Sequence, residues 1–167
     1  MAKDDDAAIV VFTSESKQEI LRKSGTGDWV FNPNSVDRCR YVVCCRKADW
    51  KNRADGIAHR AAFLVGRIAG LTRFDESRNA RGQARFLIGI SDYAEVNRLE
   101  AWRENVRNPV AYGALKALGL EPRKLAFKPM PSPSTAVERP LTIAEAKRAL
   151  AATFGVTPED VEIIIRG

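Results

Sequence analysis

Cys44 or Cys45 could act as a nucleophile with His59, the single histidine, as its base. Both cysteines lie inside the apolar run 41–46, for which a β-strand is expected. A thiol packed inside a strand is a poor nucleophile, because burial disfavours the thiolate. The motifs of serine hydrolases, phosphate-binding loops, zinc proteases and dinucleotide-binding folds are absent from the sequence. We therefore expect no catalytic residues here and interpret the cysteines as small apolar strand residues.

Carboxylates offer a second chemistry, the magnesium-assisted cleavage of phosphodiesters. The candidates are Asp37, Asp92, Glu95 and Glu100, of which Asp92 and Glu95 follow the end of an expected strand. The alternative is structural, with Ser91 or Asp92 capping a helix whose first turn contains Glu95. We favour this helix start and keep a metal-dependent nuclease as an alternative function. No metal ligands are expected among the cysteines, which lack the Cys-x2-Cys spacing of zinc sites, and no cofactor is predicted.

Basic residues are concentrated in the middle third of the chain. Between Arg38 and Arg85 there are twelve Lys and Arg residues against four acids, a surplus of eight, whereas the whole chain carries a net charge of +6. A concentrated basic surface on strands and loops is the electrostatic footprint expected for nucleic acid. The alternative is the solvated surface of a basic protein. We favour nucleic acid and expect phosphate contacts from five of these residues, namely Arg38, Arg46, Lys47, Lys51 and Arg53.

Aromatic residues accompany this basic stretch. Trp29, Trp50, Tyr93 and Trp102 fall at the ends of expected strands or in loops, not in the middle of apolar runs. Any one of them could be a core residue. Several at element edges could instead frame a pocket in which a base stacks.

The elements that must position these residues follow from hydrophobic periodicity and turn signals. Ser16 and Glu19 form a capping box ahead of a short helix that ends before Gly25. A turn is expected at 32–35, and polar or charged connections at 48–60 and 73–83. Helices are expected at 94–107 and 110–118. Strands are expected at 8–12, 28–31, 40–47, 61–70, 84–91 and 125–128.

A linker rich in Pro and Ser divides the chain at 129–140. The main domain is then 1–128, and the tail is 141–167. Thr142 should cap a helix in the tail, and Val161–Ile165 has the composition of a strand. This helix–strand appendage is too small to hold a core alone, so we expect it to dock on the main domain, a second copy or a partner.

The start of the chain lacks the apolar region of a signal peptide, and no run of eighteen apolar residues is present. We expect a cytoplasmic location without membrane contact. Three cysteines, two of them adjacent, also fit a reducing compartment better than a disulfide framework.

The order of several short blocks resembles the PUA-like superfamily, and EVE-type domains within it. The blocks are Gly27–Pro33, Tyr41–Val43, Phe63–Ile68 and Arg85–Glu95, followed by Trp102 and Asn108–Tyr112. The resemblance covers 7–128 and implies an α+β fold, with a twisted, mixed or antiparallel, barrel-like sheet and flanking helices. It also implies a non-enzymatic reader of nucleic acid that holds a modified base in an aromatic pocket. The residues implied for that pocket are Trp29, Asn32, Tyr93, Trp102 and Asn108.

The leading hypothesis is therefore a nucleic-acid-binding module that reads a base, with DNA favoured over RNA as the partner. A protein-interaction or inhibitor module is the first alternative, in which the basic face meets an acidic partner and 141–167 contacts a protein or a second copy. The metal-dependent nuclease with Asp92 and Glu95 is the second alternative.

Overall fold

The computed structural model describes residues 5–78, 81–104, 106–131 and 142–165, without the side chains of 75–78. The chain divides into two compact units, Met1–Pro133 and Ser134–Gly167. The predicted linker 129–140 lies mostly outside the described residues. Its first residues belong to the main unit, because Pro129 pairs with Asp92 and the buried Met130 donates its N–H to the carbonyl of Ser91.

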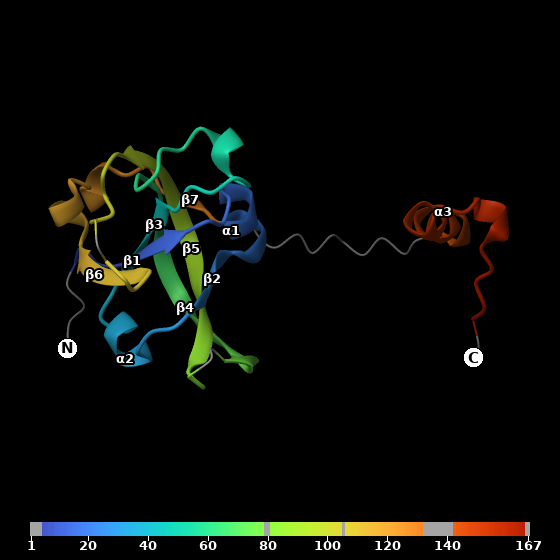
Figure 1. Cartoon of the computed structure of the whole chain (residues 1–167), viewed down its shortest axis with the longest axis horizontal. Helices are drawn as coiled ribbons and strands as arrows, with labels where there is room; N and C mark the ends of the chain where they lie inside the picture. The colour runs from blue at the N-terminus through green and yellow to red at the C-terminus, as the bar shows by residue number, and fades with distance from the viewer. Residues whose placement is uncertain (1–4, 79–80, 105, 132–141, 166–167) are drawn as a thin grey trace. The chain divides into compact units, whose positions relative to one another are not determined.

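The main unit is α+β and is built on one curled, mixed sheet (Figure 1). Six strands lie in the order β2-β5-β4-β3-β1-β6, and β7 pairs with β5. β1 and β3 run parallel, and every other strand pair among the described residues is antiparallel. The predicted α+β class with a curled sheet is confirmed. The strands are β1 (Ala7–Thr13), β2 (Gly25–Trp29), β3 (Tyr41–Arg46), β4 (Ala62–Arg78), β5 (Ala84–Arg98), β6 (Val110–Ala114) and β7 (Lys128–Pro129).

Both faces of the sheet are covered, which explains the continuous apolar runs of β1 and β3. One core contains Ile9 and Val11 of β1 and packs against Ile20 of helix α1 (Lys17–Lys23). The opposite core contains Ala8 and Val10 together with residues of the 101–127 segment, including Leu115 of the 3₁₀ turn η2 (Leu115–Leu118). A second 3₁₀ turn, η3 (Pro122–Lys124), has no buried residue. Successive side chains of β1 therefore enter different cores, as the two-residue period of a strand requires.

The helix α1 begins as predicted. Ser16 accepts a hydrogen bond from the N–H of Glu19, and Glu19 accepts one from the N–H of Ser16. Where a turn was expected after Phe31, one helical turn, α2 (Pro33–Val36), is present with Asn32 as its cap. α2 and α1 lie at opposite ends of the sheet in Figure 1.

The segment between 73 and 118 departs from the prediction. β4 continues to Arg78, where a charged connection was expected, and β5 continues to Arg98, where a helix was expected. The two long strands pair with each other over most of their length, and this pairing overrides the weak local signal. The predicted helix 110–118 is instead β6 followed by η2. Pairing of Val110–Ala114 with β1 decides that outcome.

The second unit contains α3 (Ile143–Phe154), capped by Thr142 as predicted, and the 3₁₀ turn η4 (Pro158–Asp160). The described residues 161–165 form no strand, so the predicted helix–strand tail is reduced to a helix and a turn. No helix in the described parts of the chain has the length and apolar character needed to cross a membrane.

Candidate functional site

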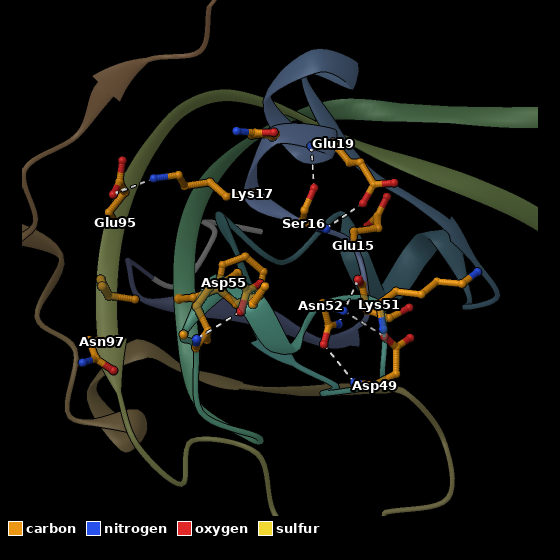
Figure 2. A pocket seen from close by; sticks show the side chains of 17 residues that line it. Glu15, Ser16, Lys17, Glu19, Asp49, Lys51, Asn52, Asp55, Glu95 and Asn97 are labelled. Carbon is orange, nitrogen blue, oxygen red and sulfur yellow. Dashed lines mark hydrogen bonds and ion pairs between the residues drawn. The ribbon is translucent and has the colours of Figure 1, made fainter.

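A large polar pocket opens beside the start of α1 (Figure 2). Its volume is about 1080 Å³. Three parts of the main unit form it: the start of α1 at 14–19, the loop after β3 at 49–57, and residues of β4 and β5 that include Phe63 and Asn97. The volume is slightly above the usual range for small-ligand sites, and an open pocket of this size has room for a nucleotide.

The loop after β3 is held by its own hydrogen bonds. The Asp49 carboxylate accepts from the N–H groups of Lys51 and Asn52, and Asn52 accepts from the N–H of Asp49. The buried Asn52 amide also donates to the carbonyls of Lys47 (2.9 Å) and Ser14 (3.2 Å). Asn52 thus ties the loop to the start of α1 and fixes two walls of the pocket relative to each other.

Arg46 and Asp55 form an ion pair between β3 and this loop. The Arg46 side chain has no exposed surface; it donates to the Asp55 carboxylate at 2.5 Å and to the Glu15 carbonyl at 2.6 Å. Its guanidinium carbon lies 4.4 Å from the centre of the Phe63 ring. Arg46 was expected to bind phosphate; the structure shows its charged group buried and engaged within the protein instead.

Glu95 of β5 lies on the far wall of the pocket between two lysines. Its carboxylate is 3.1 Å from Lys17 Nζ and 3.1 Å from Lys128 Nζ. The hydrogen bonds from Lys128 and Lys17 hold the pKa of Glu95 below its usual value. Glu15, at the start of α1, accepts from Thr26 and pairs with Lys23.

Charges in the pocket are balanced rather than strongly acidic. The lining carboxylates are those of Glu15, Glu19, Asp49, Asp55 and Glu95. Two lining lysines and three further cations paired with these acids offset them, namely Lys17, Lys51, Lys23, Arg46 and Lys128. A neutral ligand with hydrogen-bond donors suits this lining better than a bare anion does.

Trp50 lies between two lining residues, Asp49 and Lys51, and is 79% exposed. Lys51 Nζ is 5.4 Å from the centre of its ring. An exposed tryptophan beside a pocket offers a stacking surface next to a positive charge. Trp50 was one of the four aromatic residues considered for a stacking pocket, but it was not among the five residues assigned to that pocket. The signal was its place in the polar run Asp49–Asn52, where it has no apolar neighbours to pack against.

The aromatic residues predicted for a base pocket are core residues. Trp29 and Tyr93 belong to the core that contains Ile20, whereas Trp102 belongs to the opposite core and stacks on Phe12 with ring centres 4.9 Å apart. Trp29 Nε1 donates to Thr26. These three rings share no cavity among the described residues, and each is buried in one of the two cores.

The two predicted amides have local structural roles. Asn32 accepts from the N–H of Asn34 as the cap of α2, and Asn108 accepts from the N–H of Val110 at the start of β6. Neither lines the pocket beside α1. The expected grouping of Asn32 and Asn108 with the three rings is therefore not formed.

Four of the five predicted phosphate contacts are exposed, at two separate places. Lys47, Lys51 and Arg53 lie on the loop after β3, beside the pocket, whereas Arg38 precedes β3 at its other end. Only the first group is positioned to act together with the pocket.

The remaining candidates for chemistry do not converge. Burial raises the pKa of Cys44, and raises that of Cys45 to about 12. His59 Nδ1 accepts from the N–H of Ala48. Neither thiol is therefore poised to act as a nucleophile with His59.

The carboxylate pair of the nuclease alternative is separated by the strand. Asp92 and Glu95 both lie within β5, not at a helix start, and residues three apart on a strand point to opposite faces. Asp92 accepts from Ser91, while Glu95 faces the lysines of the pocket. Within the described residues, no three His, Cys, Asp or Glu side chains come together as metal ligands.

Comparison of the chain with protein-family models, with curated proteins and with solved structures returned no match.

Proposed function

We propose that the main unit is a nucleic-acid-binding module that takes a single base into the pocket beside α1. The observation that carries the proposal is Trp50, exposed to 79% between two residues of the pocket lining. An exposed large aromatic ring in a polar loop gains nothing from core packing, whereas it could stack on a base. Lys47, Lys51 and Arg53 on the same loop supply charges for the flanking phosphates.

The curled sheet suits the finer proposal that the fold is PUA-like and of EVE type. The stacking surface in this proposal is the exposed ring of Trp50, in place of the buried Trp29, Tyr93 and Trp102. Reading a base within a duplex requires its extrusion, at a cost of a few kcal/mol, which stacking and hydrogen bonds must offset. A single-stranded partner avoids that cost. A cytoplasmic location, where the thiols of the three cysteines stay reduced, belongs to the same proposal.

Trp50 also provides a direct test. Trp29 and Trp102 are buried, so the tryptophan emission that acrylamide can quench comes mainly from Trp50. We expect oligonucleotides to quench this emission and to protect it from acrylamide. The same oligonucleotides, labelled for fluorescence anisotropy at two salt concentrations, should bind in a salt-sensitive way. Binding should weaken roughly tenfold in Trp50→Ala, by loss of one stacking contact, and less in Trp50→Phe. Binding that is insensitive to salt and to Trp50→Ala contradicts the proposal.

The second unit supports one additional proposed function, which is to bind another protein. Among its described residues Ala151 is the only buried one, whereas most of its large apolar residues are exposed. The exposed residues are Ile143, Leu150, Phe154, Val156, Ile164 and Ile165. Comparing the full chain with residues 1–133 in pull-downs and nucleic-acid titrations tests this second function. If the second unit binds a protein, the full chain should retain a partner in the pull-down that residues 1–133 do not retain. The affinity for nucleic acid should be the same for both chains.

A further inference from the structure

Asp55 is a hydrogen-bond acceptor held in one orientation at the pocket. One carboxylate oxygen accepts from the buried guanidinium of Arg46 at 2.5 Å, and the other accepts from the N–H of Ile57 at 3.0 Å. The side chain keeps 27% of its surface exposed and lines the pocket, as Figure 2 shows. The group is thus anchored from within the protein and remains open to a ligand.

Asp55 also has unused acceptor capacity. An ionised carboxylate offers about four lone-pair sites and no donor. The bonds from Arg46 and Ile57 use one site on each oxygen, so each oxygen has capacity for one more donor. Two parallel donors on a planar ligand would match two carboxylate oxygens, in the way that the two N–H groups of a guanidinium match a carboxylate.

Among the bases, guanine has this pattern on its Watson–Crick edge, where N1–H and the N2 amino group are adjacent donors. Adenine and cytosine place a ring-nitrogen acceptor beside their amino group, and thymine and uracil place one N–H between two carbonyls. Each of these edges would set an acceptor against a carboxylate oxygen that can only accept. A site whose polar group stays unpaired with the wrong ligand rejects that ligand strongly.

We propose that Asp55 makes the pocket selective for guanine, by accepting both donors of its Watson–Crick edge. This inference rests on the function proposed above. The buried Phe63 packs its ring against the Arg46 guanidinium that holds Asp55. Asn97 of β5 lines the same pocket and carries an amide that can donate to guanine O6.

The test uses the wild-type full chain and changes the ligand. The probes are labelled oligothymidylates with one central guanine, hypoxanthine, 1-methylguanine or adenine. Hypoxanthine lacks the N2 amino group, and 1-methylguanine lacks the N1 proton. We expect each of these two changes to weaken binding roughly tenfold or more, because each removes a hydrogen bond to a charged acceptor. The adenine probe should bind as weakly as the weaker of the hypoxanthine and 1-methylguanine probes.

The outcomes separate the inference from the function beneath it. Equal affinities for all four probes, within twofold, overturn the guanine selectivity while nucleic-acid binding stands. No binding of any probe at low salt overturns both. On the protein side, Asp55→Asn should abolish the guanine preference, because the new amide donates where two acceptors are needed. Glu104→Gln, an exposed acid paired with Arg60 and outside the pocket lining, is the matched control and should keep the preference. If Asp55→Asn does not fold, the ligand series decides alone.

Discussion

Arg46, with no exposed side-chain surface, is joined to Asp55 by a 2.5 Å hydrogen bond from its guanidinium to the carboxylate. Among the described residues, Arg46 Nε has no hydrogen-bond partner, so the buried charge depends on Asp55 and on the Glu15 carbonyl for its compensation. A buried charge is costly to leave unpaired, whereas the pair itself can be replaced by apolar residues at little cost. The pair therefore fixes the orientation of Asp55 more than it stabilises the fold.

We expect Asp55→Ala to lower the free energy of unfolding by about 3 kcal/mol, because it leaves the Arg46 charge buried without a counter-ion. The double variant Arg46→Met with Asp55→Ala should recover most of that loss, since methionine packs well against the Phe63 ring. Urea denaturation of the single and double variants provides the measurement. Equal destabilisation in both would show that the loss comes from loop contacts and not from the unpaired charge.

The end of the main unit can be located by two truncations. A chain ending at residue 133 keeps Lys128, Pro129 and the buried Met130, whereas a chain ending at 127 loses all three. We expect 1–133 to unfold at the same urea concentration as the full chain. The 1–127 chain should be less stable by about 2–4 kcal/mol, the range for removing a buried methionine side chain from a core. Equal stability of the two truncated chains would place the boundary at 128, as the Pro and Ser pattern predicted.

Local patterns predicted the elements whose signals are local. Ser16 with Glu19, and Thr142 with its helix, follow capping rules that involve only neighbouring residues, and both caps form. The extension of β5 through Glu95 had no such signal, because pairing with β4 decides it. The predicted strand at 161–165 is absent from the described residues, where no neighbouring strand pairs with it.

The candidate site was harder to predict than the fold. Arg46 follows an apolar run, and nothing in the local sequence distinguishes it from an arginine that is exposed at the end of a strand. Its burial depends on Asp55, which the fold of the following loop brings to it. Likewise, nothing local shows that Trp29 and Trp102 enter opposite cores while Trp50 stays exposed. The aromatic and basic residues in the sequence indicated base stacking and phosphate binding. Only the packing shows which tryptophans and which basic residues are accessible.

Gly25 of β2 and Gly70 of β4 make a matched pair for testing how closely β2 and β5 approach. A Cβ on Gly25 would lie 2.5 Å from the carbonyl oxygen of Ile88, whereas a Cβ on Gly70 would meet nothing within 4 Å. Gly25→Ala should therefore cost about 1–3 kcal/mol through overpacking against backbone. Gly70→Ala should be neutral or slightly stabilising, because it only restricts the unfolded chain. Thermal unfolding of both variants tests the contrast, and a reversed order would contradict the register of these strands.

The three cysteines should not react with thiol reagents while the protein is folded. All three are buried, and none of them forms a disulfide. Burial raises the pKa of Cys44 and raises that of Cys45 to about 12, so neither forms a thiolate at pH 8. We expect a disulfide reagent to label none of them at pH 8 until urea unfolds the protein. Rapid labelling of one thiol under native conditions would contradict the packing around β3.

The same raised pKa values predict a dependence of stability on pH. In the unfolded chain a thiol ionises above about pH 8.5, whereas the buried thiols of Cys44 and Cys45 remain protonated in the folded state. Ionisation therefore favours the unfolded state, and their contribution to stability is lost as pH rises. Each thiol should lower the free energy of unfolding by about 1 kcal/mol per pH unit between pH 9 and 10. Cys45→Ala should be less sensitive to pH over this window than the unmodified chain.

Lys47 and Arg38 offer the sharpest test of where nucleic acid lies on the main unit. Both are exposed, both belong to the basic stretch, and β3 separates them by roughly 20 Å of strand. Lys47 begins the loop that forms one wall of the pocket, whereas Arg38 lies at the other end of the sheet. If a base enters the pocket, its flanking phosphates reach Lys47 and leave Arg38 uncontacted.

Lys47→Ala should then weaken binding to single-stranded DNA for all sequences alike and reduce the slope of log K against log salt by about 0.7. Arg38→Ala should change neither quantity, because a charge outside the contact contributes little at moderate salt. Anisotropy titrations at four salt concentrations measure both slopes. Equal reductions in the two variants would indicate a diffuse basic surface, and a larger effect of Arg38→Ala would move the nucleic acid away from the pocket.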